Sequence, residues 1–309
     1  MTDAGEDYLD PLDDPLQRLA AEGGWNERAR AIEAEVARDR RKALRRLPRP
    51  PRRRRAGISW LFLLLVALAG ASGWAMWSGV VPSQAAVFVF ILAGWLVSLC
   101  LHEYAHALVA HRGGDDTIAE KGYLRLNPLK YGHPLLTFVL PLFALLTGGL
   151  PLPGGAVLVE SERLRSRHRD ALVSMAGPAV NIVFAAVLLF VTAQFGPTGI
   201  YDLGEPHAAF WAGLTLLAYL QVASAALNLL PIPGLDGYGM IEHYLPERVQ
   251  EIGRKIRPFG LVIVFLLLYL PWVRDSFGDL TFWITESSGT PVNGIYYGYQ
   301  LFQFWRGWF

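Results

Sequence analysis

The chain has 309 residues, and its 28 Lys and Arg nearly balance its 27 Asp and Glu, which leaves a formal charge of +1. Charges gather near the N-terminus and long apolar runs follow, so the composition excludes a uniform soluble domain and indicates a multi-span membrane protein. The single cysteine, Cys100, excludes an internal disulfide framework and is expected to be a packing residue.

Residues 1–56 form a polar N-terminal segment that begins acidic and ends basic. Residues 38–55 contain eleven Arg or Lys against one Asp. We expect a largely disordered tail. An arginine run could bind nucleic acid, but directly before a membrane span it favours an anchor on the cytoplasmic side, with no nucleic-acid partner.

Apolar runs long enough to span a membrane, about 20 residues each, occur at residues 58–80, 86–110, 171–195 and 208–231. The run at 259–273 is shorter, with arginines able to snorkel at its ends. We therefore predict an all-α polytopic helix bundle of about five to six spans over residues 57–275. Residues 276–309 are rich in aromatic side chains and predict a C-terminal segment at the membrane interface.

The run at 86–110 ends in the pattern H-E-x-x-H, formed by His102, Glu103 and His106. On a helix, positions i and i+4 share a face, so both imidazoles can bind one Zn²⁺. Zinc lowers the pKa of its bound water to about 7, and Glu103 can take the proton without being a ligand. Ionisable groups inside membrane segments are rare and usually functional, so a hydrolytic zinc site is favoured over two structural histidines.

A hydrolytic zinc site needs a third protein ligand. Asp236 is the favoured candidate, although it could be a turn aspartate at the membrane surface. It follows the 208–231 run, where Pro231 ends the helix and Gly234 lets the chain bend. The other candidates are His111, His133, His168, Glu160 and His243.

The membrane topology supplies a separate argument. If the basic tail is cytoplasmic, the first span runs outward and the H-E-x-x-H helix runs inward. Asp236 reaches the same ion only if its preceding helix also runs inward, so residues 134–159 must make no net crossing. Prolines and glycines interrupt that run, as a re-entrant segment requires. The zinc site is then expected toward the cytoplasmic side.

Two asparagines and one extended stretch are candidates for substrate binding. Asn181 could hydrogen-bond a substrate backbone or a developing oxyanion, and Asn228 could assist. Asparagines in membrane helices also simply tie helices together. Residues 155–160 have strand character and predict a short β edge that could pair with an extended substrate.

The segments HEYAH (102–106), GPAVN (177–181) and NLLPIPGLDG (228–237) occur in the order found in the site-2 protease family. The chain resembles the compact bacterial type of these intramembrane zinc metalloproteases, without a PDZ domain. The resemblance implies His102, His106 and Asp236 as ligands, Glu103 as the catalytic base and Asn181 as a substrate-side residue. His133 stands where compact relatives often have an acidic residue, and LPLPGG (150–155) replaces their usual tryptophan-lysine-proline stretch.

The sequence therefore predicts an intramembrane zinc metalloprotease of the inner cell membrane, with one Zn²⁺ per chain. Its expected partners are the lipid bilayer and single-span membrane proteins, whose transmembrane helices it would cut. One alternative is a membrane metal carrier or transporter that uses the same ligands, but its ligands would be distributed along a pore. Another is a catalytically silent membrane scaffold, which would have lost Glu103 or a ligand.

Overall fold

The computed structural model describes residues 34–35, 57–81, 83–131, 140–148, 157–197 and 207–305. Contacts divide the chain into two compact units, Met1–Arg52 and Arg53–Phe309. The tail prediction therefore falls almost wholly outside the described residues, and all elements below belong to the second unit. The described residues contain helices and no strand, which confirms the all-α prediction.

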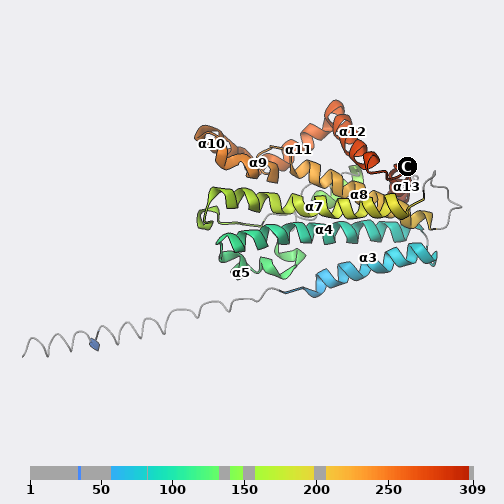
Figure 1. Cartoon of the computed structure of the whole chain (residues 1–309), viewed down its shortest axis with the longest axis horizontal. Helices are drawn as coiled ribbons and strands as arrows, with labels where there is room; N and C mark the ends of the chain where they lie inside the picture. Colours follow the sequence, from blue (N-terminus) through green and yellow to red (C-terminus); the bar gives the residue numbers. More distant parts are fainter. Residues whose placement is uncertain are drawn as a thin grey trace, which may run out of the picture. The chain divides into compact units, whose positions relative to one another are not determined.

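Four long helices form the bundle: α3 (Trp60–Ser78), α4 (Ser83–Gly113), α7 (Arg167–Phe195) and α8 (Ala208–Asn228). Each is long and apolar enough to cross a membrane. Helix α4 packs against α3, α7 and α8, and α7 also packs against α8 (Figure 1). The apolar window of α8 is 78% buried and that of α3 only 22%, so α8 lies in the bundle interior and α3 at its edge.

Helices α4 and α8 run in the same direction. Phe90 of α4 lies beside Gly213 of α8, and eight residues further along both helices Ser98 bonds to Gln221. Because the two contacts are equally spaced along both helices, α4 and α8 are parallel. Their C-terminal ends therefore lie at the same end of the bundle, as the topology argument requires.

Helix α7 runs antiparallel to α4. Its Asn181 contacts His102 of α4. Arg165, two residues before the start of α7, donates its main-chain N–H to the carbonyl of Gly113 at the end of α4, at 3.2 Å. The chain thus leaves α4 and enters α7 at the same end of the bundle. This arrangement agrees with the prediction that residues 134–159 make no net crossing, although most of these residues lie outside the described part of the chain.

One helix of this return segment is described, α6 (Leu140–Gly148). Its nine described residues extend about 14 Å. Leu145 is fully buried in the main apolar core, so one face of α6 is covered by other helices, while Phe143 is 58% exposed. The expected β edge is absent from residues 157–160, the described part of that run.

The C-terminal third is a set of shorter helices. How these helices are counted decides whether the described residues hold four or five candidate spans. The expected span at 259–273 is only α11 (Gly260–Tyr269), and the chain bends by 93° into α12 (Pro271–Ser287). Leu270 is extended and Pro271 cannot donate a helical hydrogen bond, which explains the break. The described residues therefore hold four candidate spans, or five if the bent pair is one, and the upper value agrees with the lower end of the predicted five to six.

The last helix, α13 (Asn293–Phe302), packs against α8 and α4. A Cβ on Gly298 would lie 2.6 Å from the Ala212 carbonyl, so glycine permits this close approach, and Phe302 is fully buried. An interfacial position for this segment stays a prediction. The remaining helices are α5 (Thr117–Lys121), α9 (Asp236–Ile241), α10 (Glu247–Ile256) and 3₁₀ turns at Tyr123–Arg125, Pro128–Lys130, Ser161–Arg163, Glu242–Tyr244 and Arg257–Phe259.

Candidate metal centre

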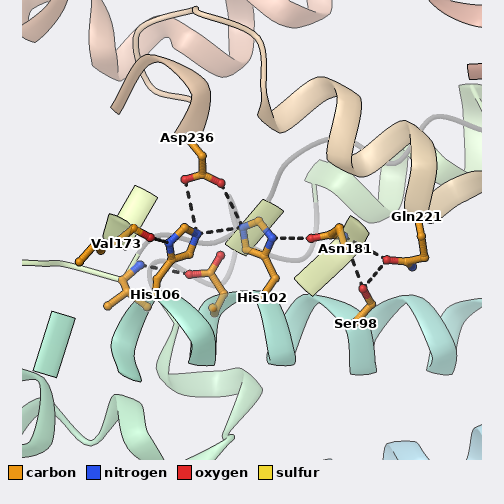
Figure 2. Close-up of polar contacts among 9 residues, drawn as sticks. Ser98, His102, His106, Val173, Asn181, Gln221 and Asp236 are labelled. Atoms are coloured by element: carbon orange, nitrogen blue, oxygen red, sulfur yellow. Dashed lines mark hydrogen bonds and ion pairs between the residues drawn. The ribbon is translucent and has the colours of Figure 1, made fainter. Parts of the chain in front are cut away.

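Helix α4 presents His102 and His106 on one buried face toward α7 and α9 (Figure 2). They are four residues apart, so they lie one helical turn from each other on the same side. Their Nε2 atoms are 3.0 Å apart. The two imidazoles therefore converge on one point, as the H-E-x-x-H spacing predicts.

Asp236 completes the group from the first turn of α9. Its Oδ2 lies 3.2 Å from His102 Nε2 and its Oδ1 3.4 Å from His106 Nε2. Two glycines make this approach possible. Gly234 has a φ of +103°, and a Cβ on Gly237 would lie 2.2 Å from the Leu229 carbonyl.

The geometry of this group fits a zinc ion. One ligand atom from each of the three residues lies within 4.8 Å of the others. Ligands about 2.0–2.1 Å from a tetrahedral zinc are separated by roughly 3.3 Å, close to the distances above. The space between them is open only because residue 177 is glycine, since a Cβ there would lie 2.2 Å from His106 Nε2 and 2.5 Å from His102 Nε2.

Hydrogen bonds behind the histidines fix which ring nitrogen faces this space. His106 Nδ1–H donates to the Val173 carbonyl and His102 Nδ1–H to Asn181 Oδ1, each at 2.6 Å (Figure 2). With the proton on Nδ1, the lone pair on Nε2 is free to bind metal.

Asn181 thus has a different place from the expected one. Its Oδ1 accepts from His102, and its Nδ2 donates to Gln221 and Ser98. Both polar ends are directed into the bundle, so the structure places Asn181 behind a ligand rather than beside a substrate. Asn228 does line the cavity at the metal centre, where its substrate role stays a prediction.

Glu103 is buried beside the ligand group without belonging to it. Its Oε2 accepts a hydrogen bond of 3.2 Å from the Val157 main-chain N–H. The carboxylate is therefore held by the chain segment that precedes α7. Sequence reasoning does not identify this amide, because its role depends on a contact between residues 54 positions apart.

The surroundings of Asp236 favour the ionised form of its carboxyl group. Partial burial alone would raise the pKa of this carboxyl, but the adjacent His106 and His102 lower it below its ordinary value. An ionised carboxylate and two imidazoles form a donor set suited to zinc.

A cavity of about 560 Å³ opens onto the metal centre. Its lining includes all three ligand residues, Glu103 and the segment 157–159. Charged side chains from other elements also line it, among them two pairs in contact, His243 with Asp170 and Arg257 with Glu242. The cavity makes the metal centre accessible to solvent.

The other candidates for the third ligand lie elsewhere. His243 contacts Asp170, Glu160 bonds to Lys121 and Arg163, and His168 bonds to Tyr244. His111 lies near Asp115 and Asp116, and His133 lies outside the described residues.

Membrane-length helices that bring a buried H-E-x-x-H pair and an aspartate together form a metal centre of the kind expected in a membrane zinc metalloprotease. A protein of Mycolicibacterium smegmatis named "Putative zinc metalloprotease Rip2" is 41% identical over 263 residues, which cover 84% of this chain and 98% of the relative. The protein of the same name in Mycobacterium tuberculosis strain H37Rv is 41% identical over 247 residues, covering 79% of this chain and 92% of that protein.

A more distant relative, "Putative zinc metalloprotease YwhC" of Bacillus subtilis, is 33% identical over 204 residues, covering 65% of this chain and 87% of YwhC. No family model matches the sequence, and no solved structure matches the chain. From these relatives, the chain belongs to the site-2 protease family of zinc metalloproteases. The predictions of a zinc cofactor and of this family are thereby confirmed.

Proposed function

We propose that the chain is an endopeptidase that cuts the transmembrane helices of single-span membrane proteins. The observation that carries the proposal is the position of Glu103. This buried carboxylate lies next to the three-ligand group, on a helix that is itself long and apolar enough to span a membrane. A buried acidic group of this kind in a membrane helix is a catalytic candidate.

The chain's own residues divide the chemistry among them. His102, His106 and Asp236 would hold the zinc, which when bound supplies a water of lowered pKa and polarises the peptide carbonyl. Glu103 accepts the proton of the attacking water and then gives it to the leaving amine. The Val157 amide, bonded to Oε2, orients Glu103 and leaves Oε1 available for this transfer.

The segment 157–159 supports binding of an extended substrate. It lines the cavity beside Glu103, and Leu158 is 63% exposed. A substrate helix would have to unwind locally before its main chain could lie along this segment, because helical amides and carbonyls are already bonded to each other.

We further propose that the metal centre faces the cytoplasm across the inner membrane, with the N-terminus on the cytoplasmic side. Exposed basic side chains gather at the metal-centre end of the bundle, where α4 ends and α7 begins. Basic loops favour the cytoplasmic face. The residues concerned are Arg112, Arg125, Lys130, Arg163 and Arg165.

The experiment compares the wild-type chain with Glu103→Gln in source cells that lack the native gene. Zinc content is measured on both purified proteins, and peptides with new termini are mapped in the membrane fraction. We expect equal zinc content, and new termini inside transmembrane segments only with the wild type. Equal cleavage by a zinc-loaded Glu103→Gln protein would refute the role of Glu103. New termini only in soluble loops would refute intramembrane cutting.

Crosslinking then identifies what the protein binds. Glu103→Gln protein carrying a photoreactive residue at Leu158, which is exposed at the cavity, is irradiated in membranes and the adducts are sequenced. Single-span proteins that also acquire new termini with the wild type are the expected adducts. Adducts made only with multi-span proteins or soluble proteins would contradict the proposed substrate class.

A further inference from the structure

A buried chain of polar side chains extends from the metal centre into the middle of the bundle (Figure 2). Asn181 Nδ2 donates to Gln221 Oε1 at 3.0 Å, and Ser98 Oγ donates to the same oxygen at 2.5 Å. Gln221 is completely buried, and Ser98 and Asn181 are nearly so. These hydrogen bonds link Gln221 of α8 to His102 of α4 through Asn181 of α7.

Packing alone does not explain a glutamine at position 221. Its neighbours along α8, Leu220 and Val222, are buried apolar residues, as is most of that helix. Gln221 Nε2 has no hydrogen-bond partner among the described residues. Burying an unpaired amide group costs free energy that a residue such as leucine or methionine would avoid. The Oε1 end of the side chain must therefore compensate.

That oxygen determines how the Asn181 amide is oriented. Gln221 Oε1 can only accept, so it bonds to the NH₂ group of Asn181 and turns Oδ1 toward His102. If the amide were rotated by 180°, two acceptor oxygens would face each other and the NH₂ group would point at the imidazole. The bond between Gln221 and Asn181 thus selects one of two amide orientations of the same shape.

The amide orientation in turn fixes the tautomer of His102. Oδ1 accepts only if Nδ1 carries the proton, which leaves Nε2 unprotonated and directed at Asp236. A rotated Asn181 would donate to Nδ1 and favour a proton on Nε2, and that tautomer cannot bind metal through Nε2. The orientation of one amide decides whether His102 is a ligand.

We propose that Gln221 is a positioning residue for the metal centre, which selects the metal-binding tautomer of His102 by orienting Asn181. Ser98, the second donor to Oε1, holds the Gln221 side chain in place. The proposal concerns zinc affinity, so it does not depend on which substrate is cut or on cleavage at all.

The test measures the dissociation constant for zinc on the purified full chain, by competition with a fluorescent chelator. Gln221→Met keeps the approximate size of the side chain and removes the acceptor. We expect it to weaken zinc binding by about 10- to 100-fold, as loss of a partner behind a ligand typically does. The matched control is Leu220→Met, at an adjacent and equally buried position, which should bind zinc as the wild type does.

A double variant separates positioning from packing. In an Asn181→Asp background both atoms that can face His102 are oxygens, so no orientation needs to be selected. There Gln221→Met should weaken zinc binding, relative to Asn181→Asp alone, by a smaller factor than it does in the wild-type background. Wild-type affinity in Gln221→Met, or an equal loss in both backgrounds, would overturn the proposal. Circular dichroism checks that each variant is folded, and Gln221→Leu replaces Gln221→Met if the latter is not.

Discussion

The space occupied by a metal ion in this protein is closed to any side chain at position 177. Gly177 lies on α7 opposite the two histidines, and a Cβ there would lie 2.2 Å from His106 Nε2 and 2.5 Å from His102 Nε2. We predict that Gly177→Ala abolishes high-affinity zinc binding and with it all peptidase activity, while α7 remains helical.

The size of the effect follows from these distances. An ordinary contact begins near 3.4 Å, so His106 Nε2 would have to withdraw by about 1.2 Å. Metal sites tolerate displacements of about 0.2 Å from ideal ligand distances. Neither imidazole can withdraw easily, because each Nδ1 is held by a bond of 2.6 Å. We expect the dissociation constant to rise at least about 100-fold, or about 2.7 kcal/mol.

The assay is chelator competition together with the zinc-dependent shift in melting temperature, which reports binding to the folded state without any substrate. Alanine favours a helix interior over glycine by about 0.5–1 kcal/mol, so helix propensity does not destabilise the metal-free variant. Gly70→Ala on α3 is the control, since a Cβ there meets nothing within 4 Å. Zinc affinity within threefold of the wild type in Gly177→Ala would refute the placement of the ion.

Three further predictions concern the segment beside the catalytic carboxylate and the membrane orientation. Asp115 is fully buried, and its carboxylate accepts a hydrogen bond of 2.8 Å from the Glu160 main-chain N–H, which anchors the segment beside Glu103. Asp115→Asn should therefore lower peptidase activity about 10-fold or more and leave zinc content unchanged. Wild-type activity in this variant would exclude the anchoring role. Hydrogen bonds from Lys121 and a neighbouring arginine lower the pKa of Glu160 to about 2 from an ordinary value of 4.5. Because the folded-state pKa is the lower one, this pairing stabilises the protein above pH 4.5 and is lost as the pH falls toward 2. Glu160→Gln should therefore lower the melting temperature more at pH 6 than at pH 2.5, and a difference independent of pH would count against the pairing. The only native cysteine is buried, so an impermeant maleimide should react only with an introduced cysteine. We expect it to label Val80→Cys in intact cells and Arg165→Cys only after lysis. The reverse pattern would invert the proposed topology.

The parts of the site that sequence reasoning could predict are those set by local spacing. His102 and His106 share a helix face because of the helical period, whatever the rest of the chain does. The prediction of Asp236 needs two steps. Prolines and glycines mark the end of the preceding helix, and the membrane topology then places Asp236 at the same end of the bundle as the histidines. The structure brings all three together.

What could not be predicted depends on contacts between distant segments. The hydropathy of residues 259–273 does not reveal the 93° bend after α11, because that bend depends on packing as well as on Pro271. The strand character of residues 155–160 reflects propensity, and residues 157–160 have no partner strand among the described residues with which to realise it.

Asn181 shows most clearly how a residue can be identified from its motif while its role depends on distant contacts. Its motif marks it as important, and its side chain can serve a substrate or another helix equally well. The choice depends on Gln221, 40 residues away, which in the sequence is one polar position in an apolar run. Once that glutamine takes the amide NH₂ group, the remaining oxygen has His102 as its partner. The role of Asn181 is therefore a property of the packed bundle, and the zinc affinity of Gln221 variants measures it directly.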